Sequence, residues 1–318
     1  MARSLQTSGL AVALVSSVAF ALSGPLAKPL LDTGWSPGAA ALLRIGGAAL
    51  ALALPCLLLL RTTGARILSA NWRYLGGYAA LAVAGTQIGF FSAIQTLPVA
   101  VALLIEYTGP VLVVGWLWWR RGQRPTGATV AGGALAMVGL VLILDPTSTS
   151  SALDPRGIAW AAFAAVCLAG YFLLSGHIHE DLPPLLVVGV GMVGGWILLA
   201  VAAAVGLLAV QTSTDPVTLG GTQLPWWAVA AALVLIATVF AYLTGIAAAR
   251  RLGARLASFV SLMELVMATV LSAVLLSQTP GPREILGGVV ILAGLVLVRL
   301  GEPEPESPLP IEEKCVAA

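Results

Sequence analysis

Long apolar segments separated by short polar turns make up most of this chain. Each segment is close to the roughly 20 residues that an α-helix needs to cross the hydrocarbon core of a bilayer. The pattern predicts ten transmembrane helices, at residues 9–30, 38–60, 74–95, 98–119, 126–144, 157–178, 184–210, 226–249, 254–277 and 284–300. The connections between them are short, so we expect no sizeable soluble domain.

The second half of the chain repeats the first. Residues 93–143 resemble residues 248–298 at a constant offset of 155 positions. Both copies carry Gln-x-Pro (123–125 and 278–280), a double glycine (132–133 and 287–288) and Gly-Leu-Val-Leu (139–142 and 294–297). Because each half holds an odd number of spans, the second half enters the membrane from the opposite side. The predicted fold is an all-α integral membrane protein whose ten transmembrane helices form two inverted five-helix repeats.

The boundaries of the repeats follow from local composition. We expect a short N-terminus at 1–8, the first repeat at 9–145, a linker at 146–156, the second repeat at 157–301 and a tail at 302–318. The linker is rich in Pro, Ser, Thr and Asp, which favour turns over helix. The tail alternates Glu with Pro and has no apolar periodicity, so we expect it to be disordered. The first span is long for a signal peptide and follows a single arginine, so we expect it to be retained.

Composition and charge narrow the class of protein. Only 9% of the residues are charged and 59% are hydrophobic, against roughly 25% charged in soluble domains, which excludes a water-soluble protein. Twelve of the lysines and arginines fall in loops on one side of the predicted topology and three on the other, which predicts cytoplasmic termini and an outer linker. The basic residues form no continuous face, so we do not expect nucleic acid as a partner.

The chain lacks the motifs of enzymes and metal sites. It has no phosphate loop, no Gly-x-Ser-x-Gly and no His-Glu-x-x-His. Gly189-x-Gly191-x-x-Gly194 has the spacing of a dinucleotide fingerprint but lies within a span without a preceding strand, so we interpret it as helix packing. The cysteines lack disulfide or zinc spacing, and His177 and His179 are expected in a solvated loop. We therefore expect no cofactor, no metal and no enzymatic activity.

Two acidic residues lie deep within predicted spans. Glu106 falls in the fourth span and Glu264 in the ninth, each near the bilayer midplane by helical rise. A charge at that depth costs at least about 2.5 kcal/mol and normally faces a cavity or a partner. The offset aligns Glu106 with Ser261 and Gly109 with Glu264, and residues three apart share a helix face. The two carboxylates are therefore predicted to meet in a central substrate site; the alternative is that each hydrogen-bonds a neighbouring helix.

Other polar residues within the spans are candidates for the same site. Arg44, near the outer end of the second span, is a candidate partner for a carboxylate or an anion, and its side chain can equally extend to the outer interface. The remaining candidates are Gln87, Gln95, Tyr107, Tyr171 and Tyr242. For each of these, a helix-to-helix hydrogen bond or an interface anchor is the alternative interpretation.

Each half ends in Gly-Gly-x5-Gly-Leu-Val-Leu, and with the ten spans this resembles the EamA branch of the drug/metabolite transporter superfamily over residues 9 to 300. Ser92–Pro110 closely resembles the third-to-fourth helix segment of the threonine/homoserine exporter group. Tyr171–Gly176 and Ser261–Glu264 are also similar to that group. One difference is Leu265, which takes the place of a proline usual in the family. We therefore expect the ninth span to lack the break that Pro110 predicts in the fourth.

The resemblance implies a secondary active transporter that exports threonine, homoserine or related small metabolites across a bacterial inner membrane. Inverted repeats imply alternating access to the central site. The alternatives are an importer or an exporter of drugs and hydrophobic compounds on the same fold and, from another class, a membrane-embedded enzyme or scaffold. The expected partners are a small-molecule substrate and the lipid bilayer. The sequence leaves open whether transport is coupled to protons and whether the protein is a monomer or a homodimer.

Overall fold

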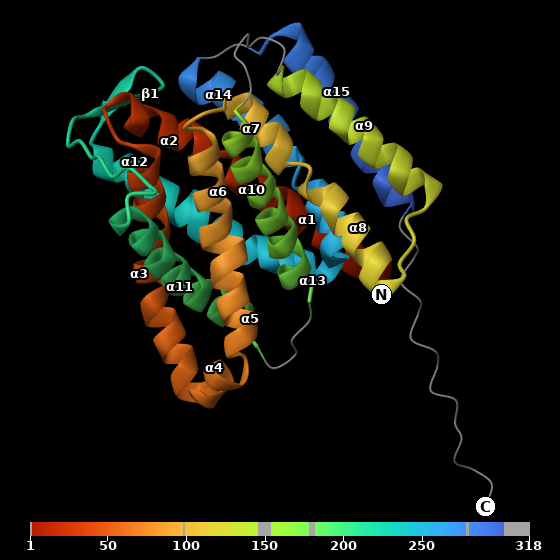
Figure 1. Ribbon diagram of the computed structural model, residues 1–318, viewed down its shortest axis with the longest axis horizontal. Helices are drawn as coiled ribbons and strands as arrows, with labels where there is room; N and C mark the ends of the chain where they lie inside the picture. Colours follow the sequence, from red (N-terminus) through yellow and green to blue (C-terminus); the bar gives the residue numbers. More distant parts are fainter. Residues whose placement is uncertain (1, 98, 146–153, 178–181, 278–279, 302–318) are drawn as a thin grey trace, which may run out of the picture.

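The computed structural model describes residues 2–97, 99–145, 154–177, 182–277 and 280–301, nearly all of them helical (Figure 1). The first half contains α1 (Ala2–Ala21), α2 (Ser23–Asp32), α3 (Pro37–Thr63), α4 (Arg66–Ala70), α5 (Trp72–Gly77), π-helix η1 (Tyr78–Gly85), α6 (Thr86–Ala93), α7 (Val99–Glu106), α8 (Gly109–Arg121) and α9 (Gly127–Leu144). The second half contains α10 (Pro155–Ser175), α11 (Pro184–Ala204), strands β1 (Val217–Leu219) and β2 (Thr222–Leu224), α12 (Trp226–Val234), π-helix η3 (Leu235–Phe240), α13 (Ala241–Val260), α14 (Met263–Leu276) and α15 (Pro282–Gly301).

The predicted number of spans is confirmed. Within the described part of the chain, eight helices are long and apolar enough to cross a membrane. One of them, Trp226–Val260, turns at Gly253, whose φ of 78° ends the eighth span, and the ninth continues through α14. The third span is formed by α5, η1 and α6 in succession. Together these segments make ten spans.

Local sequence sets where several spans begin. The Ser36 hydroxyl accepts a hydrogen bond from a first-turn amide of α3, and the Thr126 hydroxyl does the same for α9. The carboxylate of Asp154 caps α10 in the same way, and Pro155 occupies the first position of that helix. These caps satisfy amides that have no partner within the helix. Span starts are therefore encoded locally, as the sequence pattern implied.

The outer surface of the bundle is apolar. Leu50, Trp119 and Leu300 are each more than 70% exposed, whereas Tyr78 and Ile246 are completely buried between helices. A soluble protein of this size does not expose so many large apolar side chains. The surface fits the hydrocarbon of a bilayer, and the chain is a multi-pass membrane protein.

The two halves pack reciprocally. The first span of the first half (α1 and α2) packs against the eighth and ninth spans through α13, η3 and α14. The sixth span, α10, which is the equivalent of the first, packs against η1, α6, α7 and α8 of the third and fourth spans. The second and seventh spans (α3 and α11) contact each other, as do the fifth and tenth (α9 and α15), which lie side by side in Figure 1. This exchange of partners is the signature of a two-fold relation between inverted repeats.

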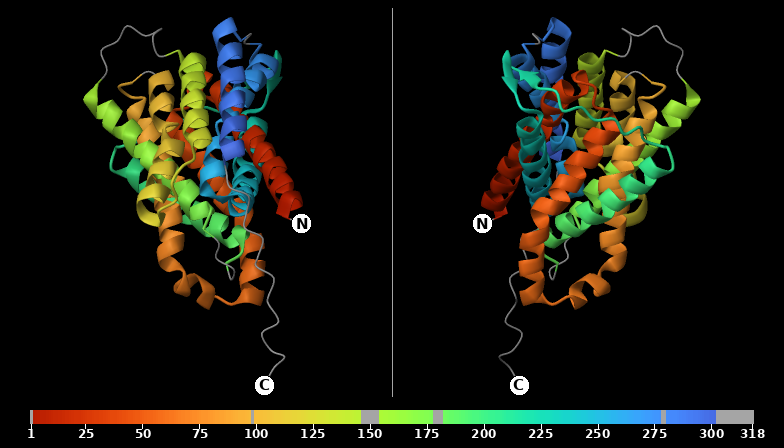
Figure 2. Two further views of the ribbon diagram at one scale, coloured as in Figure 1. Left: turned by 90° about the vertical axis from the view of Figure 1, so that its right-hand side faces the viewer. Right: turned by 90° about the vertical axis from the view of Figure 1, so that its left-hand side faces the viewer.

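The start of α1 and the end of α15 lie at the same end of the bundle, where α4 connects the second and third spans (Figure 2). The opposite end carries the hairpin of β1 and β2. An even number of spans requires this arrangement of the two ends.

A π-helix occurs at the same place in both halves. The offset of 155 positions places η3 (Leu235–Phe240) over residues 80–85, which lie within η1 (Tyr78–Gly85). The third and eighth spans therefore depart from α-helical geometry in the same register. Stretches of π-helix are rare and are found frequently at functional sites. The sequence patterns did not indicate them.

The expectation that only the fourth span breaks was wrong. In the fourth span α7 ends at Glu106 and α8 begins at Gly109, and in the ninth α13 ends at Val260 and α14 begins at Met263. Both breaks carry a hydroxyl that donates to the carbonyl three residues earlier, from Thr108 at 2.6 Å and from Ser261 at 2.7 Å. Such side-chain bonds compete with the helical ladder and bend helices, so the ninth span breaks without a proline.

Two further details differ from the sequence prediction. The seventh span ends at Ala204, so residues 205–210 belong to the connection between the seventh and eighth spans and not to the helix. The strands β1 and β2 form a small antiparallel hairpin, with Gly220 and Gly221 at positive φ in its two-residue turn. A Gly-Gly pair between short strand-forming runs is a recognised hairpin signal. His179, most of the predicted linker (146–153) and the tail from 302 lie outside the described residues.

Candidate functional site

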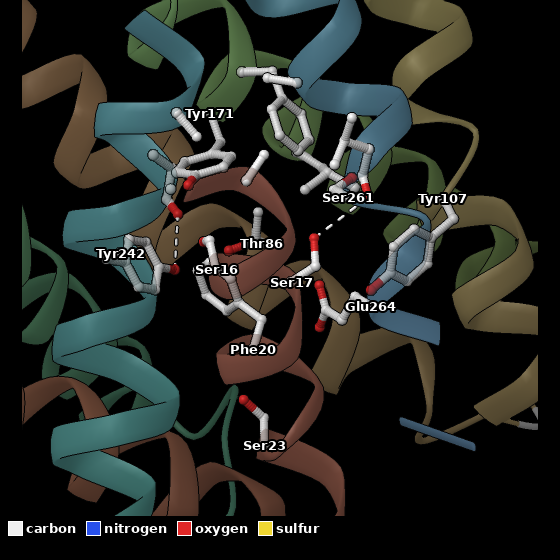
Figure 3. A pocket seen from close by; sticks show the side chains of 18 of the residues that line it. Ser16, Ser17, Phe20, Ser23, Thr86, Tyr107, Tyr171, Tyr242, Ser261 and Glu264 are labelled. Atoms are coloured by element: carbon white, nitrogen blue, oxygen red, sulfur yellow. Dashed lines mark hydrogen bonds between the residues drawn. The ribbon is translucent and has the colours of Figure 1, made fainter. Parts of the chain in front are cut away.

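A cavity of about 160 Å³ lies in the centre of the bundle and is lined by both halves (Figure 3). Seven of the residues proposed from sequence line it, namely Arg44, Gln87, Glu106, Tyr107, Tyr171, Tyr242 and Glu264. The eighth, Gln95, lies elsewhere: its amide donates to the carbonyl of Leu207, in the connection between the seventh and eighth spans, at 3.3 Å. The structure thus brings residues from six separate spans together around one space.

One wall of the cavity comes from α1 and the start of α2, which sequence reasoning did not assign to the site. Ser16, Ser17, Phe20 and Ser23 line it from this wall. Their spacing of three, four and seven residues places them on one helix face. The signal was therefore present in the sequence as a polar stripe within an apolar span. It was obscured because single serines are ordinary in transmembrane helices.

The two carboxyl groups stand at the two helix breaks. Glu106 is the last residue of α7, and Glu264 lies in the first turn of α14. A carboxylate in the first turn of a helix is stabilised by the helix dipole. The hydroxyl of Tyr107 points toward the Glu264 carboxyl (Figure 3). Each of the two broken spans therefore contributes one acid to the cavity, next to its break.

Arg44 extends from α3 toward the eighth span. Its Nε donates to the hydroxyl of Thr238 at 3.2 Å, and its Nη2 donates to the carbonyl of Ala237 at 3.4 Å. Both acceptors lie in η3, and the Thr238 hydroxyl itself donates to the carbonyl of Leu233 at 2.8 Å. Arg44 therefore faces the interior, which decides against the alternative in which it extends to the outer interface.

Aromatic rings form another side of the cavity. The ring of Tyr242 lies 5.0 Å from that of Phe20 and 5.8 Å from that of Tyr171, edge to face in both cases. The Tyr242 hydroxyl donates to the carbonyl of Ala82 in η1 at 3.3 Å. Edge-to-face packing of this kind holds rings in defined positions. This wall presents an apolar surface with hydroxyl groups at its edge.

The arrangement brings groups of both charges to one small space. A guanidinium enters from the second span, and two carboxyl groups enter from the fourth and ninth spans. Such a cavity can hold a molecule that carries both a carboxylate and an amine, because each end meets a group of opposite charge. Among the residues that the structure describes, no group of His, Cys, Asp and Glu side chains could hold a metal ion.

The glycines with dinucleotide spacing pack helices together. A Cβ added to Gly191 would lie 2.6 Å from the ring of Tyr78, and one added to Gly194 would lie 2.8 Å from Ala79. A Cβ added to Gly189 would overlap the sulfur of Cys56. The motif therefore brings α11 against α3 and η1, as interpreted from sequence.

Comparisons with known proteins agree with this architecture. Residues 7–145 and 155–300 each match the EamA-like transporter family. The threonine/homoserine exporter RhtA of Escherichia coli (strain K12) is 26% identical over 219 residues, which cover 68% of each chain. An uncharacterized inner membrane transporter, YicL of Salmonella typhimurium, is 26% identical over 67% of this chain and 68% of its own.

A solved crystal structure shares the fold. It superposes with a TM-score of 0.71 at 23% sequence identity and covers 92% of this chain and 97% of its own. Because the family match extends over both halves, it accounts for nearly all of the described structure. The chain belongs to the EamA-like transporter family and is a membrane transporter of small molecules.

Proposed function

We propose that this protein is a secondary active exporter of threonine, homoserine or related small amino acids that works by alternating access. The observation that carries the proposal is one cavity lined by Arg44, Glu106 and Glu264 together. The α-carboxylate of an amino acid would pair with the guanidinium, and its α-amine would pair with a carboxylate. The hydroxyl groups of the α1 wall would bind the side-chain hydroxyl of threonine or homoserine.

The size of the cavity supports a small cargo. At about 160 Å³ it lies below the roughly 300–1,000 Å³ of pockets that hold drug-sized ligands. The aromatic wall of Phe20, Tyr171 and Tyr242 is the observation that favours a second candidate, the export of hydrophobic compounds. The charged groups weigh against that candidate, because an apolar cargo would leave them desolvated and unpaired.

The direction of transport and its coupling are part of the same proposal. The excess of arginine at the inner loops supports cytoplasmic termini in a bacterial inner membrane. A carboxyl group that binds the substrate amine in one state and a proton in the other would couple export to proton entry. Glu264, toward which Tyr107 points, and Glu106 are the groups that would alternate in this way.

Transport assays with the purified protein test the proposal. Proteoliposomes loaded with radiolabelled threonine should release it faster than protein-free liposomes. In inside-out vesicles, an outward proton gradient from an acidic lumen should accelerate threonine uptake. A panel of labelled homoserine, leucine and a hydrophobic cation would define the cargo. Transport of the cation without transport of any amino acid would replace the proposal with the second candidate.

A further inference from the structure

The two π-helices are linked to the cavity through equivalent carbonyl groups. Ala82 in η1 and Ala237 in η3 are separated by the repeat offset of 155 positions. The carbonyl of Ala82 accepts a hydrogen bond from Tyr242, and that of Ala237 accepts one from Arg44. In both cases the donor lines the cavity and belongs to the opposite half. Each π-helix is therefore hydrogen-bonded by a side chain that also lines the cavity.

The bonds of Arg44 are weaker than those that a cargo could offer. Its contacts with Thr238 and Ala237, at 3.2 and 3.4 Å, are long for N–H···O hydrogen bonds, and both acceptors are neutral. A carboxylate can bind a guanidinium through two parallel charge-assisted bonds that are roughly twice as strong. A carboxylate that enters the cavity would therefore compete successfully for Arg44.

The acceptors in η3 can lose Arg44 without being left unpaired. The hydroxyl of Ser23 also reaches the carbonyl of Ala237, at 3.5 Å, and the hydroxyl of Thr238 keeps its bond to the carbonyl of Leu233. After the exchange the Ala237 carbonyl and the Thr238 hydroxyl each keep one hydrogen bond, which keeps the cost low.

We propose that Arg44 and Thr238 form a latch: while the cavity is empty, their hydrogen bond holds the π-helix η3 of the eighth span in place. The carboxylate of the cargo opens this latch by binding Arg44. When Arg44 turns to the carboxylate, η3 loses two donors and gains freedom to change shape. Because η3 packs against α1 and α3, that change reaches the walls of the cavity itself. The latch rests on the proposed function, since the carboxylate that opens it comes from an amino-acid cargo.

The latch makes a specific prediction about affinity. Thr238 is completely buried and does not line the cavity, so it acts on cargo only through Arg44. Thr238→Val removes one competitor for the guanidinium, so it should bind threonine more tightly, by about tenfold if a typical hydrogen bond to a charged group is lost. Its affinity for threoninol, which lacks the carboxylate, should not change. A merely structural role for Thr238 would weaken binding of both compounds or of neither.

Matched variants control for the substitution itself. Thr244→Val makes the same change six residues later, where the hydroxyl bonds only to the carbonyls of Phe240 and Ala241, and it should bind like the wild type. Thr238→Ser keeps a hydroxyl and should restore wild-type affinity. Hydrogen–deuterium exchange of the full-length protein in nanodiscs, without cargo, should be faster over 235–240 in Thr238→Val than in Thr244→Val.

The outcomes separate the latch from the proposed function. If Thr238→Val binds threonine with unchanged or lower affinity while Thr238→Ser behaves as wild type, the latch is refuted. If the wild-type protein binds neither threonine nor homoserine, the amino-acid proposal fails, and with it the opening of the latch by that carboxylate. Hydrogen–deuterium exchange in the absence of cargo then tests the contact between Arg44 and Thr238 by itself. Equal exchange rates over 235–240 in the two valine variants would refute the latch.

Discussion

Gly132 of α9 lies directly against the backbone of Gly294 in α15: a Cβ on Gly132 would stand 2.5 Å from the carbonyl oxygen of Gly294. The two-fold rotation repeats this contact, since a Cβ on Gly287 would stand 2.7 Å from the carbonyl oxygen of Gly139. Gly132 corresponds to Gly287 in the repeat, and Gly139 corresponds to Gly294. The two-fold axis therefore passes between the fifth and tenth spans, where small residues let the backbones meet.

Filling this contact should destabilise the protein. We expect Gly139→Leu to lower stability by about 1–3 kcal/mol or more, because the added side chain meets backbone atoms that cannot move aside independently. Thermal unfolding of the purified protein in detergent measures the effect. Gly115→Leu is the matched control, since a Cβ at Gly115 meets nothing within 4 Å. Equal melting temperatures for the two variants would show that the glycine contact is not required for packing.

The two carboxyl groups should be of similar importance. Because both stand at helix breaks, Glu106→Gln and Glu264→Gln should each slow threonine transport by about ten- to a hundredfold, the loss expected for one charge-assisted hydrogen bond. Vesicle transport and the amount of inserted protein are measured together. Asp32→Asn changes an exposed acid that is paired with Lys28 at the C-terminal end of α2, and this variant should transport normally. Full activity of both glutamine variants would show that neither carboxyl group is needed for transport.

The Tyr107 hydroxyl should assist Glu264. Tyr107→Phe removes the group that points toward this carboxyl and should reduce transport by about three- to tenfold, the range expected for a single neutral hydrogen bond. Its dependence on the proton gradient should change with it. Tyr74→Phe loses a hydroxyl that donates to Leu174 outside the cavity, at 2.8 Å, and serves as the control. A Tyr107→Phe protein with unaltered rate and gradient dependence would argue against a role for this hydroxyl.

Reporter fusions test the orientation. Alkaline phosphatase, which is active only outside the cytoplasm, should be active when fused at Thr149 and inactive when fused after Glu302. The prediction follows from the excess of arginine in the loops on one side of the topology. The opposite pattern of activity would show that the protein has the opposite orientation in the membrane.

The number of spans, the inverted repeat and the two central glutamates could be read from the sequence alone. Apolar length is a local property, because any segment of about 20 apolar residues satisfies its own backbone as a helix in lipid. A carboxyl group at that depth is costly wherever its helix packs, so Glu106 and Glu264 stood out without knowledge of their neighbours.

Only the tertiary structure decided the shape of the site. The π-helices and the direction of Arg44 depend on side chains from other spans, such as Tyr242 on Ala82 and Arg44 on Ala237. The serine wall of α1 acquires its meaning only because α13 and α14 pack against it. Local departures from α-helical geometry are stable where a residue distant in sequence forms hydrogen bonds with the backbone groups that they expose. The sequence pattern of one span carries no information about that distant residue.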